Sequence, residues 1–463
     1  MIEVSATRTN GAAGSPRPSR CAPLLRCRSL LLASLLLFAP LLTGCANKAQ
    51  EIADDAARDY FDGNYAGAAN KLKPLAQKTN EDFVVNNLRL GLAYLPDYQL
   101  DEAEAAFLRA WEVINSTGVN NGGRTLGAVL VDEKIKVWKG EPFERAMASF
   151  YLGLIYYIRQ DYGNARGAFE NALFKLRDVD PTTGDKSAAP DVDSNFALAT
   201  IMLAKCYQHL GREDLARANF DNVRQHYPRL AQLADYDLNA QSNLLLVVDY
   251  GYGPRKVPNE DGVVAGFSPS PMEEGPIPRP LVRVDGGVID PGNAAQPPID
   301  LLAMAQDKKW ESIDTIRAVK STVGTGLLIG SAATGLAGLN STGARQRTDL
   351  MVAGGLAAAG LLLKATSHAD IRQWETLPRT TFLLPLHVEP GTHDVTVEFP
   401  GAYGLRQMWH GLVVPPLGEA TYYMRMQRWN PGPFNWPPPG AQLPGGTSTP
   451  QVPPASTMTS TSQ

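Results

Sequence analysis

The sequence predicts an α+β protein in which an array of paired helices precedes a β-rich region. One observation is a pattern of small and aromatic residues at helical spacing, which recurs several times within residues 45–242. A second is the change of period from residue 243 onward, where β-branched and apolar runs bounded by Gly and Pro are typical of strands. A third is a Gly- and Ala-rich apolar stretch over 322–366, which predicts a helical hairpin inside the β-rich region.

The clearest helical pair extends from Phe150 to Leu176, with its turn at 161–164. Apolar residues at i, i+3 and i+4 occur on any helical hairpin, but here the same residue types recur in four copies, the last of them weaker. This pattern resembles the tetratricopeptide repeat. The copies are Leu90, Gly91, Tyr94, Ala103, Phe107 and Ala110; Leu152, Gly153, Tyr156, Ala165, Phe169 and Ala172; Leu203, Ala204, Tyr207, Ala216, Phe220 and Val223; and Ala57, Tyr60, Gly63, Ala69 and Ala76.

The copies are unevenly spaced along the chain. The interval from Gly91 to Gly153 is well above the roughly 34 residues of ordinary tandem repeats, so material is inserted between units. Such an array either serves as a scaffold alone or binds another protein on its concave face. Binding is the usual role, but the residues themselves do not decide between the two.

The N-terminal segment predicts export and anchoring. Basic residues precede an apolar run, Leu30–Leu42, which is too short for an ordinary membrane-spanning helix. The run ends in Leu-Thr-Gly-Cys45, which resembles the lipobox of bacterial lipoproteins. The resemblance implies that residues 1–44 are a signal peptide and that Cys45 is lipidated, which anchors the chain. Ala46 resembles the sorting signal for the periplasmic face of the outer membrane. A plain signal peptide with a chance cysteine is the alternative.

Charge and cysteine content restrict the partners and the cross-links. The chain has 43 Lys and Arg against 47 Asp and Glu, and the two signs are mixed along it. We therefore expect no nucleic-acid partner, because that would need a basic surface. Cys206 is the one cysteine expected to remain free after processing, and its place on a core stripe predicts a buried thiol.

Three short motif segments lie outside the repeats: VWKGEPFER (137–145), GYGPRK (251–256) and DIRQWETLP (370–378). They resemble pieces of an uncharacterised family of bacterial envelope lipoproteins with tetratricopeptide-type repeats. The resemblance implies architecture and location, and no activity is attached to it. The motif positions singled out are Trp138, Gly140, Glu141, Glu144, Arg145, Asp370, Arg372, Trp374, Leu377 and Pro378.

Physical interpretations of these motif residues remain open in part. Glu144 and Arg145 are either a ligand pair or, by preference, exposed helix charges of small energetic effect. Asp370 and Arg372 are expected to pair or to cap, while Trp374 and Leu377 anchor the start of a sheet.

The β-rich region is predicted over 243–428. A buried strand is expected within Asn243–Tyr250, and a hairpin is expected to turn at Pro390-Gly391, which pairs the strand around Leu384 with the strand around Val397. For the apolar stretch over 323–363, small residues permit close helix approach, as in membrane helix pairs. Membrane insertion and burial against the sheet are both possible, with burial slightly favoured.

The last segment, 429–463, carries no charge and is dense in Pro, Gly, Ser and Thr, so a disordered tail is expected. No metal-binding histidine spacing, nucleophile elbow or phosphate loop occurs, and the sequence predicts neither an enzyme nor a metal or cofactor site.

The sequence thus predicts a lipid-anchored envelope scaffold or adaptor that binds other envelope proteins through its array. The alternative hypothesis is a structural or oligomeric membrane component that inserts the 323–363 hairpin. A third and weaker hypothesis is an envelope hydrolase with a dispersed site.

Overall fold

The computed structural model describes residues 48–115, 137–176, 196–258, 265–272, 275–306, 370–400, 405–427, 432–439 and 441. The chain divides into two compact units, residues 1–52 and residues 53–463. The second unit contains both the helical array and the β-rich region. These two regions therefore share one core, although they are distinct along the sequence.

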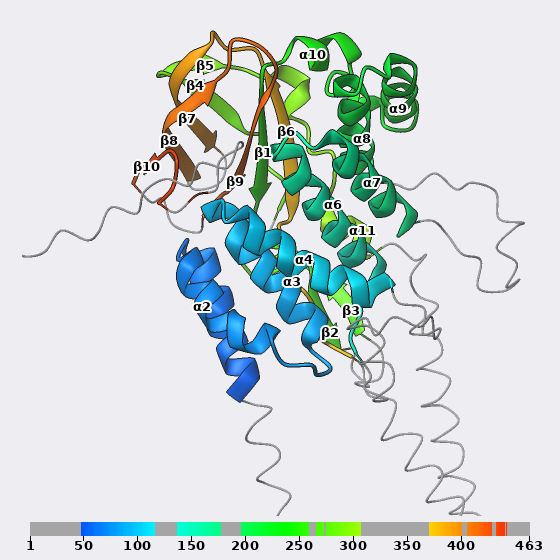
Figure 1. Cartoon of the computed structure of the whole chain (residues 1–463), viewed down its shortest axis with the longest axis vertical. Helices are drawn as coiled ribbons and strands as arrows, with labels where there is room; N and C mark the ends of the chain where they lie inside the picture. The colour runs from blue at the N-terminus through cyan, green and yellow to red at the C-terminus, as the bar shows by residue number, and fades with distance from the viewer. Residues whose placement is uncertain are drawn as a thin grey trace, which may run out of the picture. The chain divides into compact units, whose positions relative to one another are not determined.

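Paired helices form the first part of the described chain, as the sequence predicts. Residues 48–61 are helical. The helices that follow are α2 (Tyr65–Ala76), α3 (Phe83–Tyr94), η1 (Leu95–Asp97), α4 (Leu100–Asn115), α6 (Pro142–Ile158), α7 (Tyr162–Phe174), α8 (Ala197–His209), α9 (Glu213–His226), η2 (Pro228–Leu230) and α10 (Tyr236–Gln241). In Figure 1 they follow one another from α2 at the lower left to α10 at the top.

The repeated small and aromatic residues pack as the repeat pattern requires. A Cβ atom added at Gly91 would lie 2.8 Å from the Phe107 ring, and one added at Gly153 would lie 2.8 Å from the Phe169 ring. The aromatic ring of each outer helix thus fills the space that the glycine leaves on its partner. The turn between α6 and α7 lies at 159–161, earlier than the expected 161–164, and Gln160 takes the left-handed conformation there with a φ of 62°.

The array has an inner and an outer layer of helices. Almost every residue of the inner helices α3, α6 and α8 is buried. The outer helices α7 and α9 bury only three residues each, so their other faces are exposed. Inner helices that are buried all round must be covered on two sides. The outer helices cover one side, and the β-rich region covers the other.

The β-rich region begins directly after α10 and contains three sheets. One sheet has the order β6-β1-β9, the second has the order β10-β8-β7-β4-β5, and β2 pairs with β3 in the third. The elements are β1 (Leu244–Tyr250), β2 (Arg255–Pro258), β3 (Ala265–Ser268), β4 (Leu281–Val284), β5 (Gly287–Ile289), η3 (Gly292–Ala295), α11 (Leu301–Ala305), β6 (Thr380–Leu386), β7 (Gly391–Phe399), β8 (Leu405–Val414), β9 (Ala420–Arg425) and β10 (Phe434–Asn435).

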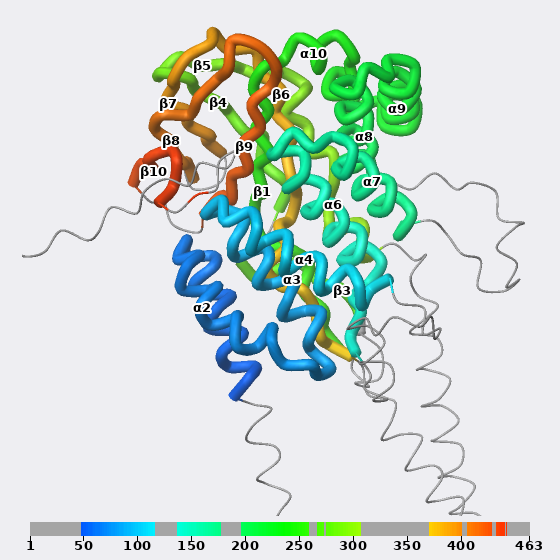
Figure 2. Tube along the Cα trace, in the orientation of Figure 1, coloured from blue at the N-terminus to red at the C-terminus, as the bar shows by residue number. Residues whose placement is uncertain are grey.

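Strand β1 is the centre of the fold and is buried along its whole length. It pairs antiparallel with β6 and parallel with β9. Because side chains alternate along a strand, Asp249 faces the inner helices while Tyr250 faces the five-stranded sheet. On the side of the five-stranded sheet, the Tyr250 ring lies 4.4 Å from the Phe399 ring of β7. On the side of the helices, β9 passes close to α6 (Figure 2).

The predicted hairpin at Pro390-Gly391 is wrong. β6 pairs with β1, whereas β7 pairs with β4 and β8 in the other sheet. The physical reason is that β1, apolar on both faces, pairs with β6 over its full length, while both edges of β7 are taken by β4 and β8. Asn243 extends this pairing by exchanging side-chain hydrogen bonds of 2.6 and 2.9 Å with the backbone of Val388. The chain then crosses to the second sheet.

The disordered tail is predicted to begin at residue 429, but the structure shows ordered residues after that point. Phe434 and Asn435 form β10, which pairs parallel with β8. The Trp436 ring lies 4.5 Å from the Tyr98 ring and 4.8 Å from the Tyr422 ring. Phe434 and Trp436 thus make apolar contacts that order this part of the chain, although its composition is rich in proline.

Four expectations lie wholly or largely outside the described residues: the signal peptide over 1–44, lipidation at Cys45, the 322–366 helical hairpin and the tail beyond residue 441. Among the described helices, none combines enough length and apolar character to span a membrane.

We predict that Gly153→Leu lowers the free energy of unfolding by about 3 kcal/mol or more, because its side chain would overlap the Phe169 ring. Chemical denaturation measures the loss. Gly167→Ala on the outer helix is the control: a Cβ there meets nothing within 4 Å, and stability should rise by about 0.5–1 kcal/mol. Equal effects of the two changes would contradict the repeat packing.

Candidate functional site

The three motif segments, distant in sequence, lie against one another in the structure. Residues 137–145 lead into α6, residues 251–256 run from the end of β1 into β2, and residues 370–378 precede β6. Trp138 Nε1 donates a hydrogen bond of 3.1 Å to the carbonyl oxygen of Arg372. We call this meeting point the motif junction.

Glu144 is the buried centre of the motif junction. Its carboxylate accepts the backbone N–H of Glu141 at 2.7 Å, which closes a capping box on α6. It also accepts the backbone N–H of Trp374 at 2.7 Å. Burial raises the pKa of Glu144 to about 7. The expectation of an exposed helix charge is wrong for Glu144, because the group links the array to the start of β6.

The second motif segment is held by both neighbours. Lys256 forms an ion pair with Glu141, and its backbone N–H donates to the side chain of Gln373. Gly253 N donates to Leu377 O at 2.8 Å, and a Cβ at Gly253 would lie only 2.8 Å from that oxygen. Glycine is therefore required by this close approach.

The third motif segment pairs as predicted and also reaches α3. Arg372 donates to Asp370 with bonds of 2.9 and 2.6 Å and to the carbonyl oxygen of Glu81 at 3.0 Å. Arg89, buried on α3, forms an ion pair of 2.7 Å with Glu375. The side chains of Trp374, Leu377 and Pro378 are all buried.

A second polar cluster, which sequence reasoning missed, surrounds Asp249 of β1. Asp249 is fully buried and accepts hydrogen bonds from Tyr151 at 2.6 Å, from Tyr423 at 2.7 Å and from Thr381. Burial raises the pKa of this carboxyl. Arg425, its neighbour on β9, donates to the backbone carbonyl of Asp249 at 3.1 Å. The sequence signal for this cluster was Asp249 itself, a single carboxylate within the otherwise apolar run Leu244–Tyr250.

The outer edge of β9 is completed by a side chain from the array. Tyr423 N donates to the Tyr98 hydroxyl at 2.7 Å, and that hydroxyl donates to Tyr423 O at 3.0 Å. Tyr98 itself lies in the left-handed conformation with a φ of 55° after η1. A hydroxyl thus replaces a neighbouring strand at this position.

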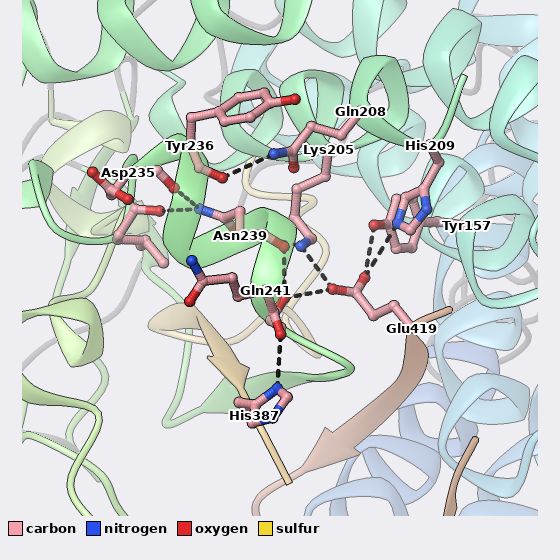
Figure 3. A network of polar contacts seen from close by, with 12 residues as sticks. Tyr157, Lys205, Gln208, His209, Asp235, Tyr236, Asn239, Gln241, His387 and Glu419 are labelled. Atoms are coloured by element: carbon pink, nitrogen blue, oxygen red, sulfur yellow. Dashed lines mark hydrogen bonds and ion pairs between the residues drawn. The ribbon is translucent and has the colours of Figure 1, made fainter. Parts of the chain in front are cut away.

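A third cluster centres on Glu419, directly before β9 (Figure 3). Its carboxylate pairs with Lys205 of α8 at 2.8 Å and accepts from Tyr157 at 2.8 Å and Ser242 at 2.9 Å. Burial alone would raise the pKa of Glu419, but the charge of Lys205 and the contact with His209 outweigh it and lower the pKa to about 2. The ion pair is almost completely buried.

These clusters share one arrangement: a side chain of an inner helix meets a polar group of the β-rich region. The carboxylates of Glu144, Asp249 and Glu419 have their partners within the chain, so the clusters act as joints. Within the described ranges, no three His, Cys, Asp or Glu side chains gather as a metal site.

The positions predicted for repeat packing are brought together within the hairpins. Their apolar members are buried except for Ala57, which is half-buried. Tyr60 is buried, whereas Tyr94, Tyr156 and Tyr207 are half-buried. Tyr156 donates to Glu104 at 2.8 Å and Tyr207 donates to Glu170 at 2.9 Å, so each tyrosine reaches the outer helix of the preceding hairpin. Cys206 is buried and free, as predicted.

Comparisons with known proteins find no family model that matches the chain and no match among curated proteins.

We predict that Lys205→Met lowers the free energy of unfolding by about 3–5 kcal/mol, because it leaves the Glu419 carboxylate buried without its cation. The double variant Lys205→Met, Glu419→Met should recover part of this loss. Lys71→Met, at a solvent-accessible pair with Asp59, is the matched control and should leave the stability nearly unchanged. Urea denaturation measures these variants together with the single change Glu419→Met. A double variant whose loss equals the sum of the two single losses would contradict the pairing.

The Glu419 pair also predicts a pH dependence. A carboxyl whose pKa falls from 4.5 in the unfolded chain to about 2 in the folded one stabilises the fold above pH 4.5. This stabilisation is lost as the pH falls from about 4.5 toward 2. The stability difference between the wild type and Glu419→Gln should therefore shrink over that window. A constant difference across it would show that Glu419 is not held ionised by Lys205.

Proposed function

We propose that the protein is a lipid-anchored adaptor of the bacterial cell envelope, which presents a rigid surface to other envelope proteins. The observation that supports the proposal best is the set of joints between array and sheet. They make the helical hairpins and the β-rich region one body, and a rigid body with a long outer helical face suits a scaffold.

The same observation changes where a partner would bind. Tyr151, Tyr157 and Lys205 project from the inner helices to Asp249 and Glu419 of the β-rich region. The face that tetratricopeptide-type arrays usually offer to a partner is therefore occupied by this chain's own sheet. The partner surface that we propose is the outer one, formed by α4, α7 and α9.

Photo-crosslinking in cells tests this surface. A photoreactive residue at Arg166 or Glu213, on the outer helices, should produce discrete adducts with envelope proteins. The matched control is the same residue at Arg283 on β4, which should give none of them. Adducts that appear equally at all three positions would contradict an outer-face partner.

A second candidate function is a membrane component that inserts residues 323–363. Described residues on both sides of that stretch contact the β2–β3 sheet: Gln306 donates to Phe267 O at 2.9 Å, and Gln373 accepts from Lys256 N. Val257, Met272 and Ile371 near these ends have large exposed apolar side chains. Such a face favours contact with an apolar layer.

We predict that Cys45→Ser releases the chain into the soluble periplasmic fraction if the lipid is its only anchor. The change is made with an export signal that is cleaved by another route, and cells are fractionated with and without detergent. Cys206→Ser is the control, since a buried thiol affects stability and not anchoring. A Cys45→Ser protein that still requires detergent would favour the second candidate.

A further inference from the structure

A polar layer crosses the array where α4, α6 and α7 meet. Asn171 of α7 accepts hydrogen bonds from Ser149 of α6 at 2.9 Å and from Trp111 of α4 at 3.3 Å. The two donors meet one acceptor, so this layer is satisfied. It also aligns the three helices, because it shows which turns lie side by side.

A second layer lies one helical turn away, toward the N-terminus of α6, and it contains cationic side chains. Helix α6 runs antiparallel to α7, so one turn back from Ser149 is Arg145 and one turn on from Asn171 is Lys175. Asn115, one turn on from Trp111, accepts from Lys175. This cationic layer, Asn115, Arg145 and Lys175, therefore holds two cations and one neutral amide.

Arg145 has no partner for its side chain within the described ranges, and its Nε atom is buried. It lies in the second turn of α6, near the positive end of the helix dipole. The nearby carboxylates are engaged elsewhere: Glu141 with Lys256, and Glu144 with two backbone N–H groups.

The cations also affect one another. Burial lowers the pKa of Lys175, and the charges of Arg145 and Lys139 lower it further. Burial lowers the pKa of Arg145 as well, and the charges of Glu141 and Glu144 only partly offset this. Half-buried cations that repel one another are stabilised by an anion between them.

We propose that the cationic layer is a binding site for a phosphoryl group. The guanidinium of Arg145 matches two oxygens of such a group, and the ammonium of Lys175 supplies a second charge. Asn115 Nδ2 donates one N–H to Trp111 O at 2.7 Å, and its second N–H supplies a neutral donor. A phosphoryl group fits better than a monocarboxylate, because its greater negative charge balances more than one cation. The site is independent of the proposed adaptor surface.

Calorimetric titration of inorganic phosphate into the full-length chain in a neutral detergent tests the site. We expect saturable binding that weakens by about tenfold or more in Arg145→Gln and in Lys175→Gln. Arg145→Lys should recover part of the affinity. Arg166→Gln is the matched control, with the same loss of charge on α7 but at an exposed pair with Glu170, and should bind like the wild type.

A melting curve separates loss of binding from loss of fold. Without phosphate, Arg145→Gln should melt near the wild-type temperature, because the change removes the repulsion of Lys175 together with the attraction to Glu141 and Glu144. Phosphate should raise the melting temperature of the wild type alone. No saturable heat in the wild type, or equal affinity in a folded Arg145→Gln, would overturn the proposal.

Two further ligands identify the source of the group. Glycerol 3-phosphate binding as tightly as inorganic phosphate would support a phosphate ester such as a lipid headgroup, whereas binding of inorganic phosphate alone would support the free ion. Acetate that competes equally at the same concentration would overturn the phosphoryl assignment.

Discussion

The structure depends on one constraint: β1 is apolar on both faces and must be covered on both. From Leu244 to Val248 the strand offers no polar side chain, and all its residues are buried. A strand of this kind is normally found inside an α/β protein, between layers of helices. Here one face is covered by the inner helices of a repeat array and the other by a second sheet. Array and sheet cannot separate without exposing β1.

Covering β1 also buries polar groups between the inner helices and the β-rich region, and each of these carboxylates has hydrogen-bond or ion-pair partners. Asp249 has three side-chain donors, Glu419 has a lysine and two hydroxyls, and Glu144 has two backbone N–H groups. An unpaired carboxylate at such a site would be costly, so each pairing favours one relative placement of array and sheet. Sliding by one residue would break all three joints together. The adaptor proposal rests on this rigidity.

Several features of fold and site were predictable because they are local. The Gly91 and Phe107 pair, and its counterpart at Gly153 and Phe169, follow from helix periodicity and residue size. The Asp370 and Arg372 pair follows from adjacency. The wrong hairpin shows the limit: two apolar strands joined by Pro-Gly favour a hairpin locally, but β6 had a better partner in β1. The start of the tail was predicted wrongly because the average composition of the segment does not show that Phe434 and Trp436 each have an aromatic partner.

The sequence by itself determined the order of elements, the repeat packing and the three motif segments. Spacing and residue size act over a few residues, and no distant contact is needed to read them. Only the tertiary structure decided that the motif segments meet, that Glu144 is buried while Arg145 is left without a partner, and that the inner face of the array is filled. These outcomes depend on which surfaces cover β1, and that choice is made by the whole chain at once, through burial of apolar area and the pairing of the polar groups buried with it.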